Sequence, residues 1–316
     1  MVSVAVALRF RKWKKIEMTV PEIVDPTWLV KHFYDVKLID ATYTLKPQLN
    51  PEDFKEKYFG KFEQLINDFK NEEYQKEHIT GAVNFNADIA FYPSKNVKFA
   101  LYEPRLFEQY VQLLGVKRDD HVLIYARGPV AGMLFASRAY WTFKIYGFEN
   151  VSVLNGGLEA WKAIGGAVKS GEEKPQKGDF EAKEIDEKLL AQFEEIPFNH
   201  LENVQYLDAR PKEQFTGEQP LGFPDAHVTG AHVKGAQSFP LSEILTSNGV
   251  KSKEDVDAVI ESHQISKGKP VIVVCNGGIQ ASVLFLALKR SGIDAKVYNG
   301  SMYELVKRAP ELINSK

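Results

Sequence analysis

The strongest constraint on the fold of this chain is an internal repeat. In the first half, residues 119–128 contain a short apolar run and lead into a helix-like segment, 133–143, and then into a second apolar run ending at an Asn-Gly pair. In the second half, residues 269–278 lead in the same way into 281–291 and into an apolar run ending at an Asn-Gly pair. Because a fixed order of similar elements is typical of duplicated units, we expect two copies of one domain.

Landmarks upstream of these segments also occur twice. An Asp-Ala pair follows apolar residues at Asp40 and again at Asp208. A His-x-x-Gly-Ala element begins at His78 and again at His232. The repeat therefore extends over most of each half of the chain.

The period of the apolar residues predicts the fold class. Residues 122–125 and 271–274 are apolar throughout, which is typical of strands buried on both faces of a sheet. Both runs are followed by segments with helical spacing. Strands that alternate with helices predict an α/β fold, here two tandem domains that each have a mainly parallel sheet flanked by helices.

These boundaries divide the 316 residues into four parts. Residues 1–23 form a basic N-terminal leader, 24–168 the first domain, 169–188 a linker and 189–316 the second domain. Twelve of the twenty linker residues are charged, and glycine and proline interrupt them, so we expect an exposed connection.

Composition excludes several classes of function. The formal charge of -2, from 40 basic and 42 acidic residues, leaves no basic surplus for nucleic acid, and we expect none as a partner. No apolar run reaches the roughly 20 residues that cross a bilayer, so we expect no membrane association.

In the leader the basic cluster follows the apolar residues, the reverse of a secretory signal. The absence of acidic residues before Glu17 is shared with mitochondrial presequences, so we expect a cytoplasmic protein, with mitochondrial import as the alternative.

The single cysteine, Cys275, lies where a strand is expected to end and a helix to begin. One cysteine cannot form an internal disulfide or a thiolate zinc site, and we expect no metal and no cofactor. Two glycines in the following loop, Gly277 and Gly278, allow the backbone N–H groups to turn toward the sulfur and stabilise a thiolate. We therefore expect Cys275 to be catalytic and the loop that follows it to bind substrate, through Asn276, Gly277, Gly278, Ile279, Gln280 and Ala281.

A free cysteine is more often a small residue that only packs in the core. A cysteine-free copy of the same loop would show which features belong to Cys275 alone. The repeat supplies one, because Ala126 occupies the position that matches Cys275 in the first copy. Its loop contains Pro129, which has no N–H to donate. The first domain is thus expected to be catalytically inactive and the second to be active.

In these motifs the chain resembles the two-domain rhodanese-type sulfurtransferases, over about residues 24–310. This family includes thiosulfate and 3-mercaptopyruvate sulfurtransferases. The likeness rests on the repeated elements above, the Asn-Gly-Gly-Leu-x-x-Trp element 155–161 and the Val-Val-Cys loop at Cys275. It implies that Cys275 accepts sulfane sulfur from a small donor as a persulfide and passes it to a thiophilic acceptor. Because the chain has no second cysteine, that acceptor must be external, such as cyanide, a small thiol or a thioredoxin-like protein.

The loop differs from both types of family member. Thiosulfate enzymes follow the cysteine with Arg-Lys-Gly and mercaptopyruvate enzymes with Gly-Ser-Gly or Gly-Thr-Gly, whereas this chain has Asn-Gly-Gly. Where the family has an arginine that pairs with the substrate anion, the matching residue is Gln214, which we include in the substrate site. Four other cations could compensate for this missing charge, namely Arg127, Arg210, Lys212 and Lys234.

Two other functions compete with sulfur transfer. Cysteine phosphatases and arsenate reductases need an arginine six residues after the cysteine, and Ala281 stands there, so we exclude them. A degenerate rhodanese that binds a partner or senses sulfur species remains the alternative, since Gln214 and Asn276 lack charge. Of the histidines, His78 has a possible proton-relay role, but we favour a structural one because His232 repeats it in the other copy.

Overall fold

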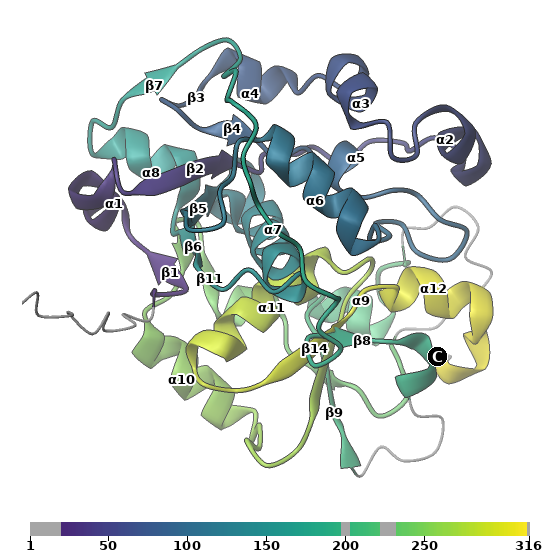
Figure 1. Ribbon diagram of the computed structural model, residues 1–316. Helices are drawn as coiled ribbons and strands as arrows, with labels where there is room; N and C mark the ends of the chain where they lie inside the picture. Colours follow the sequence, from purple (N-terminus) through teal and green to yellow (C-terminus); the bar gives the residue numbers. More distant parts are fainter. Residues whose placement is uncertain (1–19, 197–202, 222–231, 315–316) are drawn as a thin grey trace, which may run out of the picture.

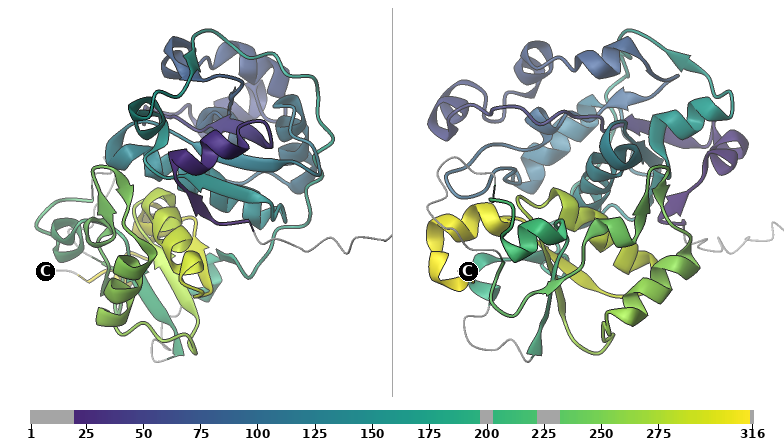
Figure 2. Two further views of the ribbon diagram at one scale, coloured as in Figure 1. Left: turned by 90° about the vertical axis from the view of Figure 1, so that its left-hand side faces the viewer. Right: turned by 180° about the vertical axis from the view of Figure 1, so that it is seen from behind.

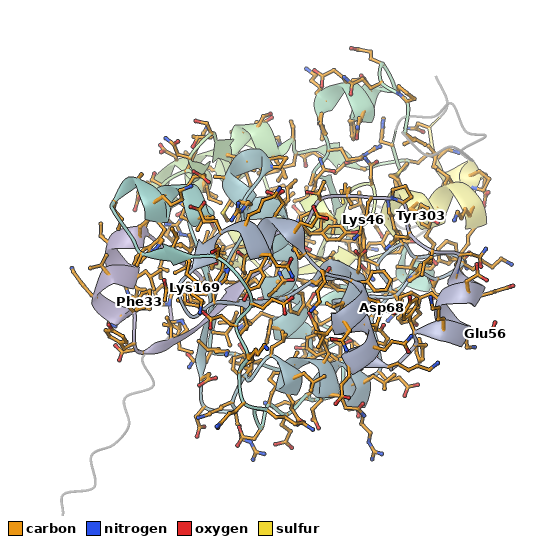
Figure 3. All side chains as sticks on the ribbon, turned by 90° about the horizontal axis from the view of Figure 1, so that it is seen from above. Phe33, Lys46, Glu56, Asp68, Lys169 and Tyr303 are labelled. Atoms are coloured by element: carbon orange, nitrogen blue, oxygen red, sulfur yellow. The ribbon has the colours of Figure 1, made fainter. Side chains whose placement is uncertain are left out.

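The computed structural model describes residues 20–196, 203–221 and 232–314, and consists of two α/β lobes (Figure 1). Most of the expected leader, residues 1–19, lies outside the described residues. In Figure 2 the N-terminal lobe, purple to teal, meets the C-terminal lobe, green to yellow, along one side. Side chains fill the space around both sheets (Figure 3). No helix of the described residues is long and apolar enough to cross a membrane.

Each lobe contains a five-stranded sheet in which every neighbouring pair is parallel. The first sheet has the order β1 (Ile23–Val24), β6 (Val151–Leu154), β5 (His121–Tyr125), β2 (Val36–Asp40), β4 (Val83–Asn84). The second has the order β10 (Gln237–Ser238), β9 (Gln205–Asp208), β13 (Val271–Val274), β14 (Ala295–Tyr298), β8 (Leu190–Ala191). Read from opposite edges, the two orders are the same, which confirms the predicted fold class and its duplication.

The central strands are buried because helices cover both faces of each sheet. All four residues of β13 are buried, as are the last four of β5. Equivalent residues of the two copies also form equivalent backbone hydrogen bonds. Leu158 N–H donates to Ala126 O in the first domain, and Met302 N–H donates to Cys275 O in the second. The two copies therefore hold the end of their central strand by the same backbone contact.

The helices follow the strands as the spacing predicted. Those of the N-terminal domain are α1 (Pro26–His32), α2 (Pro51–Lys57), α3 (Phe62–Asp68), α4 (Glu72–Lys76), α5 (Ala87–Ala90), α6 (Pro104–Leu113), α7 (Met133–Ile145) and α8 (Gly157–Ala163). Those of the C-terminal domain are α9 (Lys212–Thr216), α10 (Lys253–Ser262), α11 (Ile279–Arg290) and α12 (Ser301–Arg308). Two short antiparallel pairs, β3 (His78–Ile79) with β7 (Val168–Lys169) and β11 (Leu245–Thr246) with β12 (Gly249–Val250), complete the structure.

Helices α7 and α11 join the two domains. They pack against each other in the centre of the molecule (Figure 1), and each is buried on nearly all sides. A helix that is apolar all round is one that other elements surround. As a result, a single hydrophobic cluster runs through both domains, from Val122 and Phe143 in the first to Val273 and Leu284 in the second.

Residues 169–188, the expected linker, run along the outside of the N-terminal lobe (Figure 2). Most of the segment is exposed or half-buried, but Phe180 is 1% exposed and belongs to the main hydrophobic cluster. Backbone bonds hold it at intervals, from Gly171 N–H to Gln75 O and from Gly178 N–H to Gln112 O. The segment therefore packs as a strap on the first domain.

A polar contact also ties the domains together. Asn155, at the end of β6, donates from Nδ2 to Val250 O at 2.9 Å and accepts from Val250 N–H at 2.8 Å. Val250 is 5% exposed, so both of its backbone groups depend on this side chain.

We expect Asn155→Ala to lower the free energy of unfolding by about 1–3 kcal/mol, because it leaves a buried N–H and a buried carbonyl without partners. Asn67→Ala, at an exposed position of α3, is the control and is expected to change it by less than about 0.5 kcal/mol. Equilibrium unfolding in guanidinium chloride measures both. Equal effects from the two substitutions would contradict this role for Asn155.

Candidate active site

Cys275 lies immediately after β13, the central strand of its sheet, and is 1% exposed. Only three residues separate it from α11, so strand, loop and helix form one tight turn. In open α/β sheets, ligands bind beyond the carboxyl ends of the strands. The sequence prediction that Cys275 lies at a strand end before a helix is confirmed.

The loop directs a backbone donor at the sulfur. Gly278 N–H donates to Cys275 Sγ at 3.1 Å, and Gly278 is the N-cap of the twelve-residue helix α11. Its φ is +82°, a conformation that favours glycine. The partial positive charge of the helix N-terminus adds to the effect of the N–H, so the sulfur lies where a negative charge is stabilised.

The first turn of α12 holds the loop from the other side. Cys275 N–H donates to Ser301 Oγ at 3.2 Å, and Tyr303 N–H donates to Asn276 O at 3.0 Å. Ser301 has a positive φ of 49°, and its hydroxyl donates in turn to Tyr298 O. The position of Cys275 is therefore fixed by α11 and α12 together.

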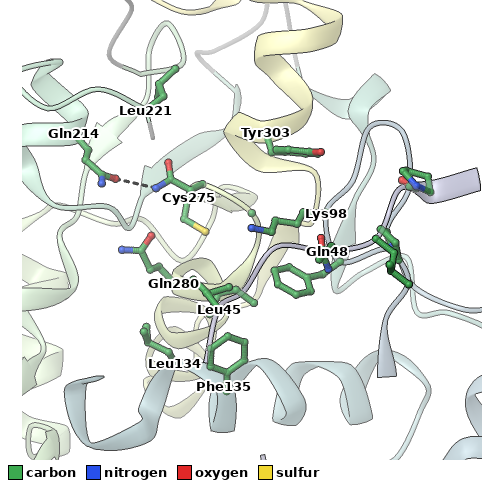
Figure 4. A pocket seen from close by; sticks show the side chains of 18 of the residues that line it. Leu45, Gln48, Lys98, Leu134, Phe135, Gln214, Leu221, Cys275, Gln280 and Tyr303 are labelled. Atoms are coloured by element: carbon green, nitrogen blue, oxygen red, sulfur yellow. Dashed lines mark hydrogen bonds between the residues drawn. The ribbon is translucent and has the colours of Figure 1, made fainter. Parts of the chain in front are cut away.

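Cys275 opens into a cavity of about 690 Å³ between the two domains (Figure 4). Its walls are largely apolar, and the N-terminal domain supplies more than half of the lining residues that the structure describes. These are Leu45, Gln48, Leu49, Asn50, Pro51, Pro93, Ser94, Lys98, Phe99, Leu134 and Phe135 from the N-terminal domain, and Gln214, Leu221, Cys275, Asn276, Gly277, Ile279, Gln280 and Tyr303 from the C-terminal domain.

Most of the residues predicted to bind substrate line this cavity. Asn276, Gly277, Ile279, Gln280 and Gln214 all do so. Asn276 Nδ2 donates to Gln214 Oε1 at 3.0 Å, which the dashed line in Figure 4 marks. The two uncharged residues that replace family cations thus form one hydrogen-bonded pair beside Cys275.

Gly278 and Ala281 lie elsewhere. Gly278 is absent from the lining and contributes through its N–H to the sulfur. Ala281 is fully buried in the main hydrophobic cluster and does not line the cavity.

The cations expected to compensate do not line the cavity either. Arg210 is fully buried and pairs with Asp208 at 2.7 Å, with a longer contact to Asn276 Oδ1 at 3.5 Å. Arg127 binds Glu77 O in the N-terminal domain. Lys212 and Lys234 are exposed. Among the described lining residues the charged one is Lys98, whose side chain points toward the Cys275 side of the cavity in Figure 4.

The two histidines of the repeated element have structural contacts. His78 is fully buried, stacks on Tyr74 and bonds Tyr74 O through Nδ1 at 2.9 Å. His232 stacks on Phe215 and bonds Phe215 O through Nδ1 at 2.8 Å. Neither lines the cavity, in agreement with the structural role that the repeat favoured.

Sequence reasoning missed Lys98, Ser301 and the apolar wall from the N-terminal domain. Ser301 had a detectable signal, because it follows the repeated Asn-Gly pair that closes each copy. Lys98 had none, since it lies about 180 residues from Cys275 in a segment without a motif. The described residues contain no group of three or more histidine, cysteine, aspartate or glutamate side chains that could hold a metal.

Together, the duplicated parallel sheet and the cysteine between strand and helix define a two-domain rhodanese-like protein. The family model "Rhodanese-like domain" matches residues 50–164 and 198–308, and the chain belongs to this family. It is a sulfurtransferase of the thiosulfate and 3-mercaptopyruvate type.

Individual relatives support this placement. The Caenorhabditis elegans protein mpst-4 is 38% identical over 297 residues, covering 94% of this chain and 88% of that protein. The thiosulfate sulfurtransferase of Gallus gallus is 35% identical over 246 residues, 76% of this chain and 82% of its own. The crystal structure of SseA, a 3-mercaptopyruvate enzyme of Escherichia coli, superposes with a TM-score of 0.71 at 26% identity, covering 90% of this chain and all of SseA.

The glycine pair allows a matched test of the loop. A Cβ on Gly278 would lie 2.9 Å from both Arg138 Nη1 and Asn299 Oδ1, whereas one on Gly277 would meet nothing within 4 Å. We expect Gly278→Ala to lower the free energy of unfolding by about 1–3 kcal/mol and to reduce sulfur transfer. Gly277→Ala should stay within about 0.5 kcal/mol of the original protein. Denaturant titration of both variants checks this. Equal stability of the two variants would contradict the close packing described around Gly278.

Proposed function

We propose that Cys275 carries the transferred sulfur as a persulfide, in a cavity completed by both domains. The observation that supports this most directly is the 3.1 Å hydrogen bond from Gly278 N–H to Cys275 Sγ at the N-terminus of α11. A packing cysteine does not need a donor aimed at its sulfur. A sulfur that alternates between thiolate and persulfide does, because both forms are anionic.

The first half of the cycle loads the sulfur. The Cys275 thiolate attacks the outer sulfur of the donor, and a new S–S bond forms. With thiosulfate, the donor S–S bond breaks and sulfite leaves with the electron pair. With 3-mercaptopyruvate, the C–S bond breaks, and the carbon takes the electron pair and then a proton to give pyruvate. Each donor leaves one sulfur atom on Cys275.

The second half needs an external acceptor, because Cys275 is the only cysteine in the chain. A nucleophile such as cyanide, a small thiol or a thioredoxin-like dithiol attacks the outer sulfur, and the Cys275 thiolate leaves. A working group that must remain a free thiol fits a reducing compartment, and we propose the cytoplasm.

Donor recognition is assigned to Lys98 and the Gln214–Asn276 pair. Both donors are anions, and Lys98 is the charged residue among the described residues that line the cavity. The two amides supply further hydrogen-bond donors next to the sulfur. The cation that other members carry near the cysteine is thus replaced, in this proposal, by one from the N-terminal domain.

Incubation with thiosulfate or 3-mercaptopyruvate is expected to add the mass of one sulfur atom to the protein, because the persulfide has no internal thiol to resolve it. Intact mass spectrometry measures the adduct, and a reducing thiol should remove it. Cys275→Ser should show no adduct with either donor. An adduct that persists in Cys275→Ser, or none on the original protein, would contradict the proposal.

Lys98→Met is expected to raise the KM for both anionic donors about 10- to 100-fold, as the loss of one charge-assisted contact does. Lys95→Met is the matched control, since Lys95 is exposed, lies three residues away and does not line the cavity. Steady-state kinetics with each donor measure the effect. The same KM in both variants would remove Lys98 from the donor site.

A further inference from the structure

Arg138 is a buried cation that belongs to the domain without the cysteine. It lies in the middle of α7, is 1% exposed, and reaches across the domain boundary to the loop of Cys275. Its Nη1 donates to Gly278 O at 3.4 Å. Gly278 is the residue whose N–H binds the sulfur, so Arg138 and Cys275 contact the same glycine.

The partners of this guanidinium are neutral. Nη2 donates to Asn299 Oδ1 at 2.7 Å and to Phe99 O at 3.1 Å, and the rings of Phe91 and Trp141 lie 4.6 and 4.5 Å from its central carbon. Its Nε is buried without a hydrogen-bond partner. No ion pair with a carboxylate is formed within the described ranges of the chain.

Arg210 shows the usual arrangement for comparison. It is equally buried, but it binds the Asp208 carboxylate through Nε and Nη2. Buried charges need such partners, because their removal from water is otherwise unfavourable. Arg138 is the buried arginine whose protein partners leave its charge uncompensated.

Cys275 is the group that can supply a negative charge opposite Arg138. Burial lowers the pKa of Arg138 to about 9, and the groups that oppose this shift are Cys275 and Tyr146. Burial raises the pKa of Tyr146 far above its usual range, so the phenol stays neutral. Cys275 is then the remaining one of these two groups that can carry a negative charge opposite Arg138, and an attraction between two opposite charges favours the charged form of both.

The other charged groups around the loop are already paired or belong to the cavity. Asp208 and Arg210 neutralise each other at the end of β9. Glu304 on α12 binds Tyr298 Oη and Arg308. Lys98 lines the cavity into which Cys275 opens.

We propose that Arg138 is a positioning residue that stabilises the anionic sulfur of Cys275, as thiolate and as persulfide, from the N-terminal domain. It binds the carbonyl oxygen of Gly278, the residue whose own N–H donates to the sulfur, and supplies a positive charge that no carboxylate of the described chain neutralises. The N-terminal domain, which has no cysteine, thereby completes the active site. The assignment rests on Cys275 being the sulfur carrier.

The direct test is the alkylation of Cys275 by iodoacetamide as a function of pH, which needs no sulfur donor and has a single target in this chain. The variants are Arg138→Met, which removes the charge, and Arg138→Lys, which keeps it. Lys144→Met is the matched control, because Lys144 is a buried cation on the same helix that pairs with Glu149 instead.

In Arg138→Met we expect the midpoint of the alkylation profile to rise by about one pH unit or more, and the rate at about pH 7 to fall about tenfold. Arg138→Lys should recover most of the rate, and Lys144→Met should leave the midpoint in place. A midpoint in folded Arg138→Met that matches the original protein would overturn the proposal. So would an equal shift in Lys144→Met.

A second measurement covers the case in which Arg138→Met does not fold. Cys275→Asp and Cys275→Asn differ in one charge and keep Arg138 intact. A buried carboxylate is normally destabilising, so Cys275→Asn should be the more stable variant if no cation faces this position. We expect the reverse, with a higher denaturant midpoint for Cys275→Asp. Greater stability of Cys275→Asn would overturn the role of Arg138.

These readouts separate this proposal from the proposed function. If no persulfide forms but alkylation still depends on Arg138, the electrostatic role stands and the sulfur-carrier role fails. If the persulfide forms and alkylation is independent of Arg138, the reverse holds.

Discussion

The packing of α7 against α11 is the contact on which the active site depends. Helix α11 begins at the loop that holds Cys275, and α7 lies against it from the other domain. Because both helices are apolar on nearly all sides, they can only be stable inside a shared core. The same contact brings Arg138 to Gly278 and forms the apolar wall of the cavity from Leu134 and Phe135.

This packing gives the domain without a cysteine a physical role. Its own strand end has Ala126 in place of a cysteine, and the following loop turns through Val130 and Ala131 at positive φ, without a glycine at either position. That loop contacts β12 of the second domain. One copy of the duplicated unit therefore supports the other, and both copies keep the same backbone bond at the end of the central strand, at Ala126 and at Cys275.

Much of this arrangement could be predicted from the sequence, because it depends on local order. The repeat and the apolar runs give the two sheets, and the glycines after Cys275 give the tight turn with an N–H near the sulfur. Residues that reach the site through tertiary contacts could not be found in this way. Arg138 lies within an apolar helical segment, and Lys98 lies in a segment with no motif. Their significance depends on which domain face meets the loop, and chain order alone does not contain that information.

The positive charges near Cys275 also come from the N-terminal domain and not from the domain that carries the cysteine. In the C-terminal domain, Asp208 neutralises Arg210, while Asn276 in the loop and its hydrogen-bond partner Gln214 carry no charge. The positive charge near the cavity then comes from Lys98 and Arg138, both in the N-terminal domain. A change at the domain contact can therefore alter the electrostatics of Cys275 without any substitution in its loop. For a two-domain enzyme of this kind, the residues after the cysteine are an incomplete guide to donor preference, because half of the cavity is encoded elsewhere in the chain.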